Sequence, residues 1–517
     1  MINYKRRKRQ AHENSKIIIE RFSKEIDNRE VLYPGVYHIC TEIDLMDVIK
    51  KVLQDVRLRA EKIEPDWSIP IILESIGKLY YGNQKEAINY GTTFKRALVY
   101  LWDVKINNCS EKNIESILEV LRLSFVIENL HAYRRLFLID NEFEFVLKNG
   151  YCCLNYKYKL IVSEFADLIK GRGKRMRIAD VNSRLMSRNI FDFLGALRDV
   201  LHGKKPEDVQ LFKGTFYEKI PGIINAECKK FWQGIYVRYM MFVTVSINQV
   251  AENEGEEALN PAVTIFPKFA VDLQEELFTQ EIGYDIFWNK KWLECQDDEK
   301  YGNLVVERPI LRITEDGDFA TCSALLGDSI NYFIEGQILN YAFRSPKINL
   351  PAHIFKDAIS GPFEDMVINE FRKKGFLAGH VSEGGVWMTQ DSAIDLSHVA
   401  KVNVYGEIDA LAYMEKLNMA MLIECKVLND IRDYKSFKNL IAKIVDDSEG
   451  FQAKIEKKGK WVNEVLSNYF QTEVLAVCVL LTDISLPIVN FPNDNIIFIH
   501  YDKFFGMLEQ ILNDNKT

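Results

Sequence analysis

The chain has 517 residues, of which 47% are hydrophobic, 12% aromatic and 27% charged. This is the composition of an ordinary globular protein, and it excludes a disordered, fibrous or membrane-embedded class. Because a single hydrophobic core stops growing near about 300 residues, the length predicts at least two domains. The formal net charge of −8 gives no overall attraction for nucleic acid, so binding of that kind must be local.

The cysteines and the apolar segments predict a cytoplasmic protein. The nine cysteines are scattered, odd in number and free of Cys-x-x-Cys pairs, as is typical of reduced thiols. The basic run at residues 5–9 is not followed by the apolar segment of a secretory signal. The longest apolar runs are far shorter than the roughly 20 residues that span a bilayer. We therefore expect no membrane association.

Breaks in composition divide the sequence into three regions. Residues 1–255 show helical spacing of apolar residues and predict a mainly helical region of recognition or regulation. Residues 256–350 mix patterns, with a strand expected over 304–314 and a helix over 323–342, and predict a small α+β linker domain. Residues 351–517 alternate helices and strands and predict an α/β domain. The expected fold class is therefore multidomain, mainly α followed by α/β.

A β-hairpin is predicted in the α/β domain. Two apolar strands, 402–414 and 419–428, are joined by the polar-rich link 415–418. With a loop centred there, the numbers of paired residues sum to 833, which places Asp409 opposite Glu424 and Glu407 opposite Lys426. Since side chains alternate along a strand, all four then share one face of the sheet.

Two opposed carboxylates repel each other and need compensation. Mg²⁺ binds carboxylate oxygens and converts the repulsion between Asp409 and Glu424 into coordination. Lys426 adds a fixed positive charge on the same face. A hard cation beside a lysine is the arrangement that phosphodiester hydrolysis requires, because the cation lowers the pKa of bound water and both charges stabilise developing negative charge.

A helix upstream of the hairpin supplies a third acid. Ser360 and Pro362 are typical of a helix start, with Ser360 as the cap, and Gly375 is typical of a helix end. Glu364 shares the apolar stripe of Val367 and Phe371, so it is expected to face the sheet. A metal ion or a hydrogen-bonded water would give this carboxylate a partner.

Three segments together resemble the PD-(D/E)XK, or restriction-endonuclease-like, nuclease superfamily. They are Phe363-Glu364, Gly406-Glu407-Ile408-Asp409 and Ile423-Glu424-Cys425-Lys426. The resemblance covers about 351–500 and implies a mixed central sheet. The tripeptide alone carries no weight, because Glu227-Cys228-Lys229 repeats it in a segment with helical spacing. No proline precedes Asp409, which leaves the subfamily open.

The resemblance also implies roles for individual residues. Asp409, Glu424, Glu364 and the backbone carbonyl of Cys425 would hold Mg²⁺, for which Mn²⁺ can substitute, and Lys426 would position the attacking water. Glu364, Asp409, Glu424 and Lys426 would thus be the catalytic set. Accessory roles are implied for Glu407 and for a polar residue on the helix after the motif, Gln452 or Lys454.

The expected activity is therefore that of a Mg²⁺-dependent nuclease acting on DNA rather than RNA, with restriction or anti-phage defence as its context. Two cuts on a duplex would favour a homodimer, and the helical region could dock a protein partner. The alternative is a catalytically inert nuclease-like protein that binds or scaffolds. A plain surface hairpin, with a Glu407–Lys426 pair and two solvated acids, also remains open.

The densest basic segment lies outside the hairpin, at residues 170–188. Its lysines and arginines suit contacts with nucleic-acid phosphates, which position a duplex without reading its sequence. The candidates are Lys170, Arg172, Lys174, Arg175 and Arg177. A solvated start of a helix explains the same pattern, and both interpretations stay open.

Overall fold

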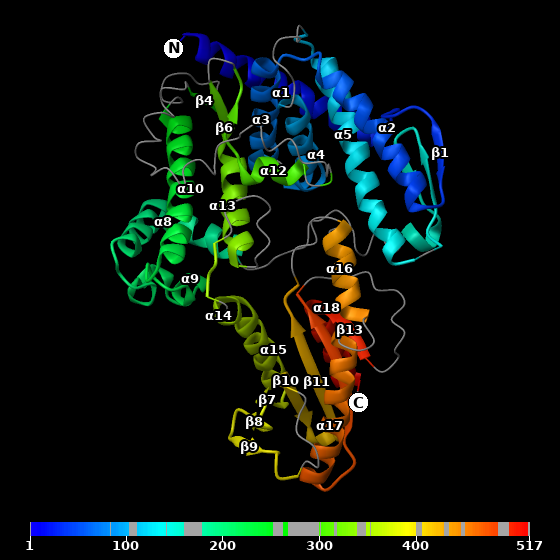
Figure 1. The fold of residues 1–517 in the computed structure, drawn as a ribbon, viewed down its shortest axis with the longest axis vertical. Helices are drawn as coiled ribbons and strands as arrows, with labels where there is room; N and C mark the ends of the chain where they lie inside the picture. The colour runs from blue at the N-terminus through cyan, green and yellow to red at the C-terminus, as the bar shows by residue number, and fades with distance from the viewer. Residues whose placement is uncertain are drawn as a thin grey trace. The chain divides into compact units, whose positions relative to one another are not determined.

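A computed structural model describes residues 2–514 except 83, 103–110, 141, 160–177, 252–261, 267–298, 300, 315–317, 339–347, 352, 400–405, 429–433, 446–449 and 484–495. The chain forms two compact units (Figure 1). The first contains Met1–Lys159 and Met176–Leu350, and the second contains Pro351–Thr517. Residues on both sides of the expected boundary at 255 fall in the first unit, and the boundary itself stays a prediction.

The first unit is mainly helical and carries two small sheets. In the sheet β1-β2-β3 and in the sheet β4-β6-β5 all neighbouring strands are antiparallel. Its helices are α1 (Ile2–Asp27), α2 (Glu42–Ala60), α3 (Pro65–Gly82), α4 (Gln84–Trp102), α5 (Ile114–Arg134), α8 (Ile178–Leu201), α9 (Phe216–Lys219), α10 (Ala226–Ala251), α12 (Tyr301–Glu307) and α13 (Ser323–Ile338). Its strands are β1 (Val36–Ile39), β2 (Phe145–Lys148), β3 (Tyr151–Cys153), β4 (Val263–Phe266), β5 (Leu311–Arg312) and β6 (Phe319–Cys322).

Of two local predictions for this unit, one is partly wrong and the other is confirmed. The strand expected over 304–314 is wrong for its first half, which forms α12, and only Leu311–Arg312 is extended. A short apolar run does not distinguish a buried helix from a buried strand. The helix expected from residue 323 is confirmed as α13. Glu227-Cys228-Lys229 lies in α10, so this tripeptide has no partner hairpin.

The second unit is built on a mixed seven-stranded sheet with the order β13-β12-β11-β10-β7-β8-β9. β11, β12 and β13 are parallel, and the other neighbours are antiparallel. The strands are β7 (Leu377–Val381), β8 (Val386–Met388), β9 (Ala393–Asp395), β10 (Ile408–Met414), β11 (Met419–Lys426), β12 (Leu475–Thr482) and β13 (Ile496–His500). The helices are α14 (His353–Phe355), α15 (Gly361–Lys373), α16 (Tyr434–Val445), α17 (Phe451–Phe470) and α18 (Tyr501–Asp514).

The predicted hairpin is formed by β10 and β11. Its register runs through Ala410↔Ile423 and Leu411↔Leu422, so the expected sum of 833 is confirmed. The turn Glu415–Leu417 is a short 3-10 helix, and Asn418 follows it with a left-handed backbone, φ 45° and ψ 37°. Asparagine tolerates this conformation better than most residues, which suits it to closing the turn.

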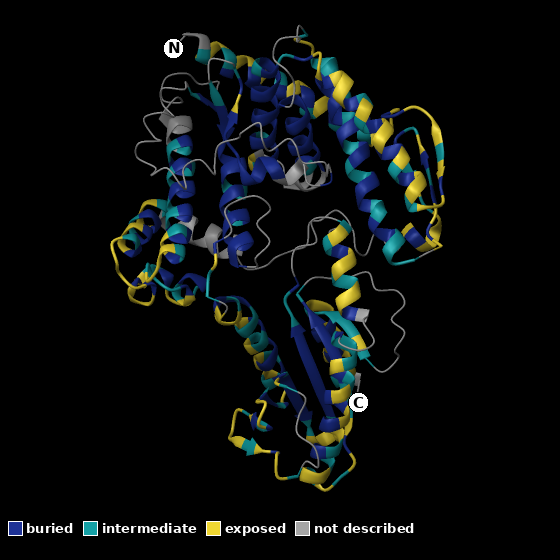
Figure 2. Ribbon diagram, in the orientation of Figure 1, coloured by how far each residue is buried: buried dark blue, intermediate teal, exposed yellow. Residues whose placement is uncertain are grey.

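Helices cover both faces of the sheet, and the apolar core separates the layers (Figure 2). α15 and α18 pack on the face that carries Ala410, Ile423 and Cys425. α17 packs on the opposite face, where Phe470 stacks on Tyr413 with ring centroids 4.2 Å apart. At Gly459 of α17, any side chain would overlap the sulfur of Cys478 in β12. Glycine therefore permits α17 to lie close against the sheet.

The start of α15 differs from its prediction, and its end agrees. Ser360 has helical φ and ψ of −73° and −44° and forms no side-chain cap, because a π-helical segment, Lys356–Ser360, runs directly into α15. The expected serine cap is therefore wrong. Gly375 ends the helical segment with φ 85°, as expected.

None of the described helices is long and apolar enough to cross a lipid bilayer.

Candidate active site

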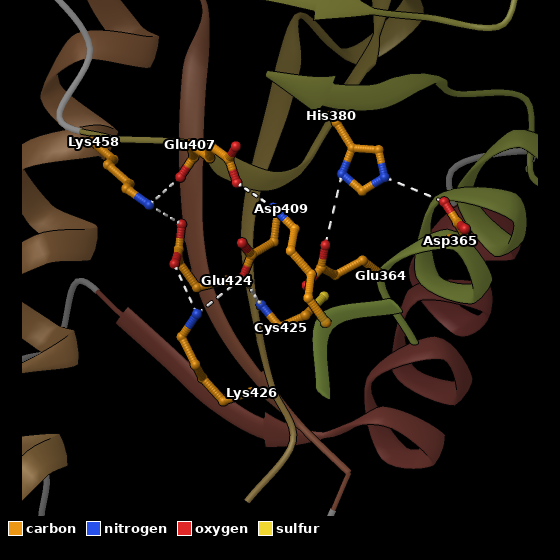
Figure 3. A network of polar contacts seen from close by, with 10 residues as sticks. Glu364, Asp365, His380, Glu407, Asp409, Glu424, Cys425, Lys426 and Lys458 are labelled. Atoms are coloured by element: carbon orange, nitrogen blue, oxygen red, sulfur yellow. Dashed lines mark hydrogen bonds and ion pairs between the residues drawn. The ribbon is translucent and has the colours of Figure 1, made fainter. Parts of the chain in front are cut away.

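Asp409, Glu424 and Lys426 lie together where β10 begins and β11 ends (Figure 3). Ala410, Ile423 and Cys425 belong to the core on the α15 side. In β11 side chains alternate, so Glu424 and Lys426 point away from this core, and Lys458 of α17 binds Glu424. Lys426 Nζ reaches Asp409 at the start of β10. The register of the hairpin thus brings two acids and a lysine from adjacent strands to one place.

Lys426 bridges the two carboxylates. Its Nζ lies 3.0 Å from Asp409 Oδ2 and 3.1 Å from Glu424 Oε2. The Cys425 backbone N–H also donates to Asp409 Oδ2, at 2.8 Å. Burial acts to lower the pKa of Lys426, but the charges of Asp409 and Glu424 outweigh burial and raise it. Lys426 therefore carries its positive charge at neutral pH.

A second lysine, which the sequence analysis did not identify, holds Glu424 from the α17 layer. Lys458 Nζ donates to Glu424 Oε1 and to the backbone carbonyl of Glu407. The side chains of Lys458 and Glu424 are only 8% and 7% exposed. Lys458 interrupts the buried stripe of α17 between Ile455 and Val462. A lysine on an apolar helix stripe is the sequence signal that could have revealed it.

The accessory residues expected on this helix lie elsewhere on it. Gln452 is half-buried and Lys454 is exposed. Lys458 lies one turn after Lys454, on the side that contacts the sheet. Phe451, at the start of α17, places its ring 5.6 Å from Lys426 Nζ, a cation–π distance. Among the described interactions, Phe451 and Lys458 are thus the residues of α17 that contact Lys426 and Glu424.

Glu424 is ionisable but costly to ionise. Burial makes the largest contribution and raises its pKa, and the nearby charge of Asp409 raises the pKa further. Lys426 and Lys458 act to lower the pKa, but the pKa of Glu424 remains above its ordinary value. The two lysines therefore compensate only part of the free energy needed to keep this carboxylate charged.

Glu364 reaches the site from α15. Its side chain is 12% exposed, and its Oε2 lies 4.0 Å from Nδ1 of His380. Burial raises the pKa of Glu364, and the charge of Asp409 adds to this shift. The other ring nitrogen of His380, Nε2, lies 3.2 Å from Asp365 Oδ1. Glu364 is thus close enough to Asp409 to feel its charge, as the sequence analysis expected of a third acid.

The expected pairing of Glu407 with Lys426 is wrong. β10 begins at Ile408, one residue after Glu407. Gly406 has φ 81°, a left-handed conformation that favours glycine, and it redirects the chain before the strand starts. The Glu407 carboxylate instead lies 2.8 Å from Lys356 Nζ, and this hydrogen bond lowers its pKa.

The donor atoms suit a hard divalent cation, although lysines now bind the acids. In the part of the chain that the structure describes, no group of three or more His, Cys, Asp and Glu side chains is arranged to hold a metal ion. The available donors are the carboxylate oxygens of Asp409, Glu424 and Glu364, which Mg²⁺ and Mn²⁺ prefer. The Cys425 N–H donates to Asp409, and the ligand role implied for the Cys425 carbonyl stays a prediction.

The five residues proposed for phosphate contacts lie outside the described residues, and the part of the basic segment from Ile178 onward forms the start of α8. These residues are Lys170, Arg172, Lys174, Arg175 and Arg177.

Comparisons with protein-family models, with curated proteins and with solved structures found no match for the chain.

Proposed function

We propose that residues 351–517 form a metal-dependent nuclease domain of the PD-(D/E)XK type, which hydrolyses phosphodiester bonds of DNA. One observation carries the proposal: the hairpin brings Asp409 and Glu424 together, so that Lys426 Nζ lies within hydrogen-bonding distance of both carboxylates. The mixed sheet with helices on both faces agrees with the fold that the resemblance implies.

Each side chain has a role in this proposal. Asp409, Glu424, Glu364 and the Cys425 carbonyl would hold Mg²⁺, which supplies Lewis-acid polarisation and a bound water of lowered pKa. Lys426 stays protonated and presents a fixed positive charge where negative charge develops on the phosphate. Lys458 orients Glu424 from the buried side and keeps its second oxygen in place.

A second candidate function is supported by a specific observation. Lys426 and Lys458 together bind both oxygens of Glu424, and Lys426 also binds Asp409, so both acids have positively charged partners without a cation. A nuclease-like domain with this closed arrangement could be inert and serve as a binding or scaffold protein. The two candidates differ in whether a divalent cation competes with Lys426 for the carboxylates.

A cleavage assay tests the proposal. The purified chain is incubated with duplex DNA, single-stranded DNA and RNA, with Mg²⁺, Mn²⁺ or EDTA. We expect metal-dependent cleavage that falls by about 100-fold or more in Asp409→Asn and in Lys426→Met, because each removes a charge at the reacting phosphate. Asp391→Asn, an exposed turn residue of the same unit, is the matched control and should cleave normally.

The result that would overturn the nuclease proposal is equally specific. If all substrates stay intact with either metal while circular dichroism shows a folded chain, the inert binding protein is the better account. If Asp409→Asn and Lys426→Met cleave as fast as the unmodified chain, the activity belongs to another site or to a contaminant.

A further inference from the structure

The helices α16 and α17 carry an excess of lysine on an otherwise acidic unit. Residues 351–517 contain 17 Lys and Arg against 24 Asp and Glu, a net charge of 17 − 24 = −7. The two helices alone contain seven lysines against two glutamates, a net charge of 7 − 2 = +5. Three acids, Asp446, Asp447 and Glu449, lie between them in the sequence, outside the described residues. With these included, residues 434–470 still carry 7 − 5 = +2.

Six of the seven lysines are exposed, and we call them the lysine surface. α17 contributes three of them, exposed and at intervals of three residues. The exposed turns of α16 contribute the other three. The members of the lysine surface are Lys435, Lys438, Lys443, Lys454, Lys457 and Lys460.

The α17 part of the lysine surface lies on the helix that contacts the candidate active site. The seventh lysine of these helices, Lys458, is the one that binds Glu424. Lys454 lies one turn before Lys458, between it and Phe451, whose ring contacts Lys426. The same helix therefore presents an inner side to the two acids and an outer row of positive charges to solvent.

We propose that the lysine surface binds the phosphate backbone of a nucleic acid and guides it to Asp409 and Glu424. The two acids repel a phosphodiester, so the domain needs a separate source of attraction. Exposed lysines make point-charge contacts with phosphates, release counterions and recognise no base sequence. The proposal takes the substrate from the proposed nuclease function, and it predicts binding through the backbone rather than through base edges.

A binding experiment tests the lysine surface apart from catalysis. The full chain is titrated into a fluorescent 20-base-pair DNA duplex in EDTA, at several salt concentrations. We expect Lys454→Gln/Lys457→Gln/Lys460→Gln to bind roughly tenfold more weakly, with the slope of log K against log salt reduced by up to about 3. Lys373→Gln/Lys416→Gln/Lys503→Gln makes the same charge change at exposed positions elsewhere in the unit and should leave affinity and slope unchanged.

Each other outcome has a defined meaning. Equal affinity and slope in the α17 variant and the unmodified chain would overturn the lysine surface, even if Mg²⁺-dependent cleavage is found. The chain is also titrated with phosphatidylserine vesicles. If the α17 variant loses binding to the vesicles but binds DNA as the unmodified chain does, the lysines form a lipid-binding surface and the proposal is overturned. Normal, lysine-dependent DNA binding without cleavage would leave the lysine surface standing and remove only the proposed nuclease activity.

Discussion

The ammonium group of Lys458 in α17 lies against the carboxylate of Glu424 in β11, and both side chains are buried. This pair connects a helix to the edge of the candidate site, and Lys426 binds the second oxygen of the same carboxylate. Glu424 is therefore held from two elements before any substrate or metal arrives. This arrangement fixes its orientation, but it also makes Glu424 dependent on the two lysines.

Removal of Lys458 should destabilise the second unit. Lys458→Met leaves Glu424 buried with one partner fewer, and breaking a buried ion pair in this way costs about 3 kcal/mol. Chemical denaturation followed by fluorescence measures the change. Lys460→Met, at an exposed position of the same helix, should change the free energy of unfolding by less than about 0.5 kcal/mol.

A double variant separates the pair from general packing. Because an apolar pair of similar volume often replaces a buried ion pair at little cost, Lys458→Met/Glu424→Leu should be more stable than Lys458→Met alone. Strictly additive losses in the double variant would show that the two residues do not act on each other.

The raised pKa of Glu364 should make the free energy of unfolding depend on pH. Its folded pKa is raised above the ordinary value of 4.5, mainly by burial and then by Asp409, so ionising it costs folding free energy. Stability attributable to this group is present below pH 4.5 and is lost as pH rises through the folded pKa. Glu364→Gln should therefore stabilise the chain at neutral pH and lose this advantage in acid.

The measurement is the free energy of unfolding of both proteins from pH 4 to pH 8 in about 1 mM EDTA. Asp365→Asn is the neighbouring control, because Asp365 is 69% exposed, and its difference from the unmodified chain should stay small. A Glu364→Gln variant that is less stable at neutral pH than in acid, relative to the unmodified chain, contradicts the stated environment of Glu364.

Close packing of α17 on the sheet should make Gly459 intolerant of a side chain. Gly459→Ala places a methyl group on the sulfur of Cys478 and should cost about 1–3 kcal/mol through overpacking. Cys478→Ala in the same chain should recover part of this loss. Gly506→Ala in α18, where nothing lies within 4 Å of the added carbon, should instead stabilise by about 0.5–1 kcal/mol. Thermal unfolding of the three variants and of the unmodified chain measures these changes.

Glu407 should be dispensable although it lies two residues from Asp409. Its carboxylate pairs with Lys356 in solvent, with exposed fractions of 55% and 59%, so Glu407→Gln should cost less than about 1 kcal/mol. Only its backbone carbonyl meets Lys458, and the substitution keeps that carbonyl. Cleavage by Glu407→Gln should match the unmodified chain; a loss as large as that expected for Asp409→Asn would assign the Glu407 carboxylate to the reaction.

The local rules of strands and turns sufficed to predict the hairpin. The period of two and a loop centred on residues 415–418 determine which residues pair, and the register follows from them. The same rules gave the wrong partner for Glu407. Gly406 has a left-handed backbone, and β10 begins only at Ile408, so Glu407 is not part of the strand. Where a strand begins depends on backbone conformation that residue type indicates only weakly.

Features that depend on contacts between distant segments could not be predicted in this way. Lys458 meets Glu424 across 34 residues, and only the packing of α17 on the sheet decides which of its four lysines turns inward. The association of residues 256–350 with the helical region also depends on long-range contacts. Trp102 of α4, for example, donates to the carbonyl of Arg312 in β5, 210 residues away.

The most direct test of the account is calorimetric titration of the full chain with Mg²⁺ and Mn²⁺, without nucleic acid. We expect a saturable site in the unmodified chain that is lost in Asp409→Asn and retained in the control Asp391→Asn. Binding should release the contact of Lys426 with the acids, so Lys426→Met should bind the metal more tightly. A chain that binds neither metal, or an Asp409→Asn variant that binds both unchanged, would contradict the assignment of these acids as a metal site.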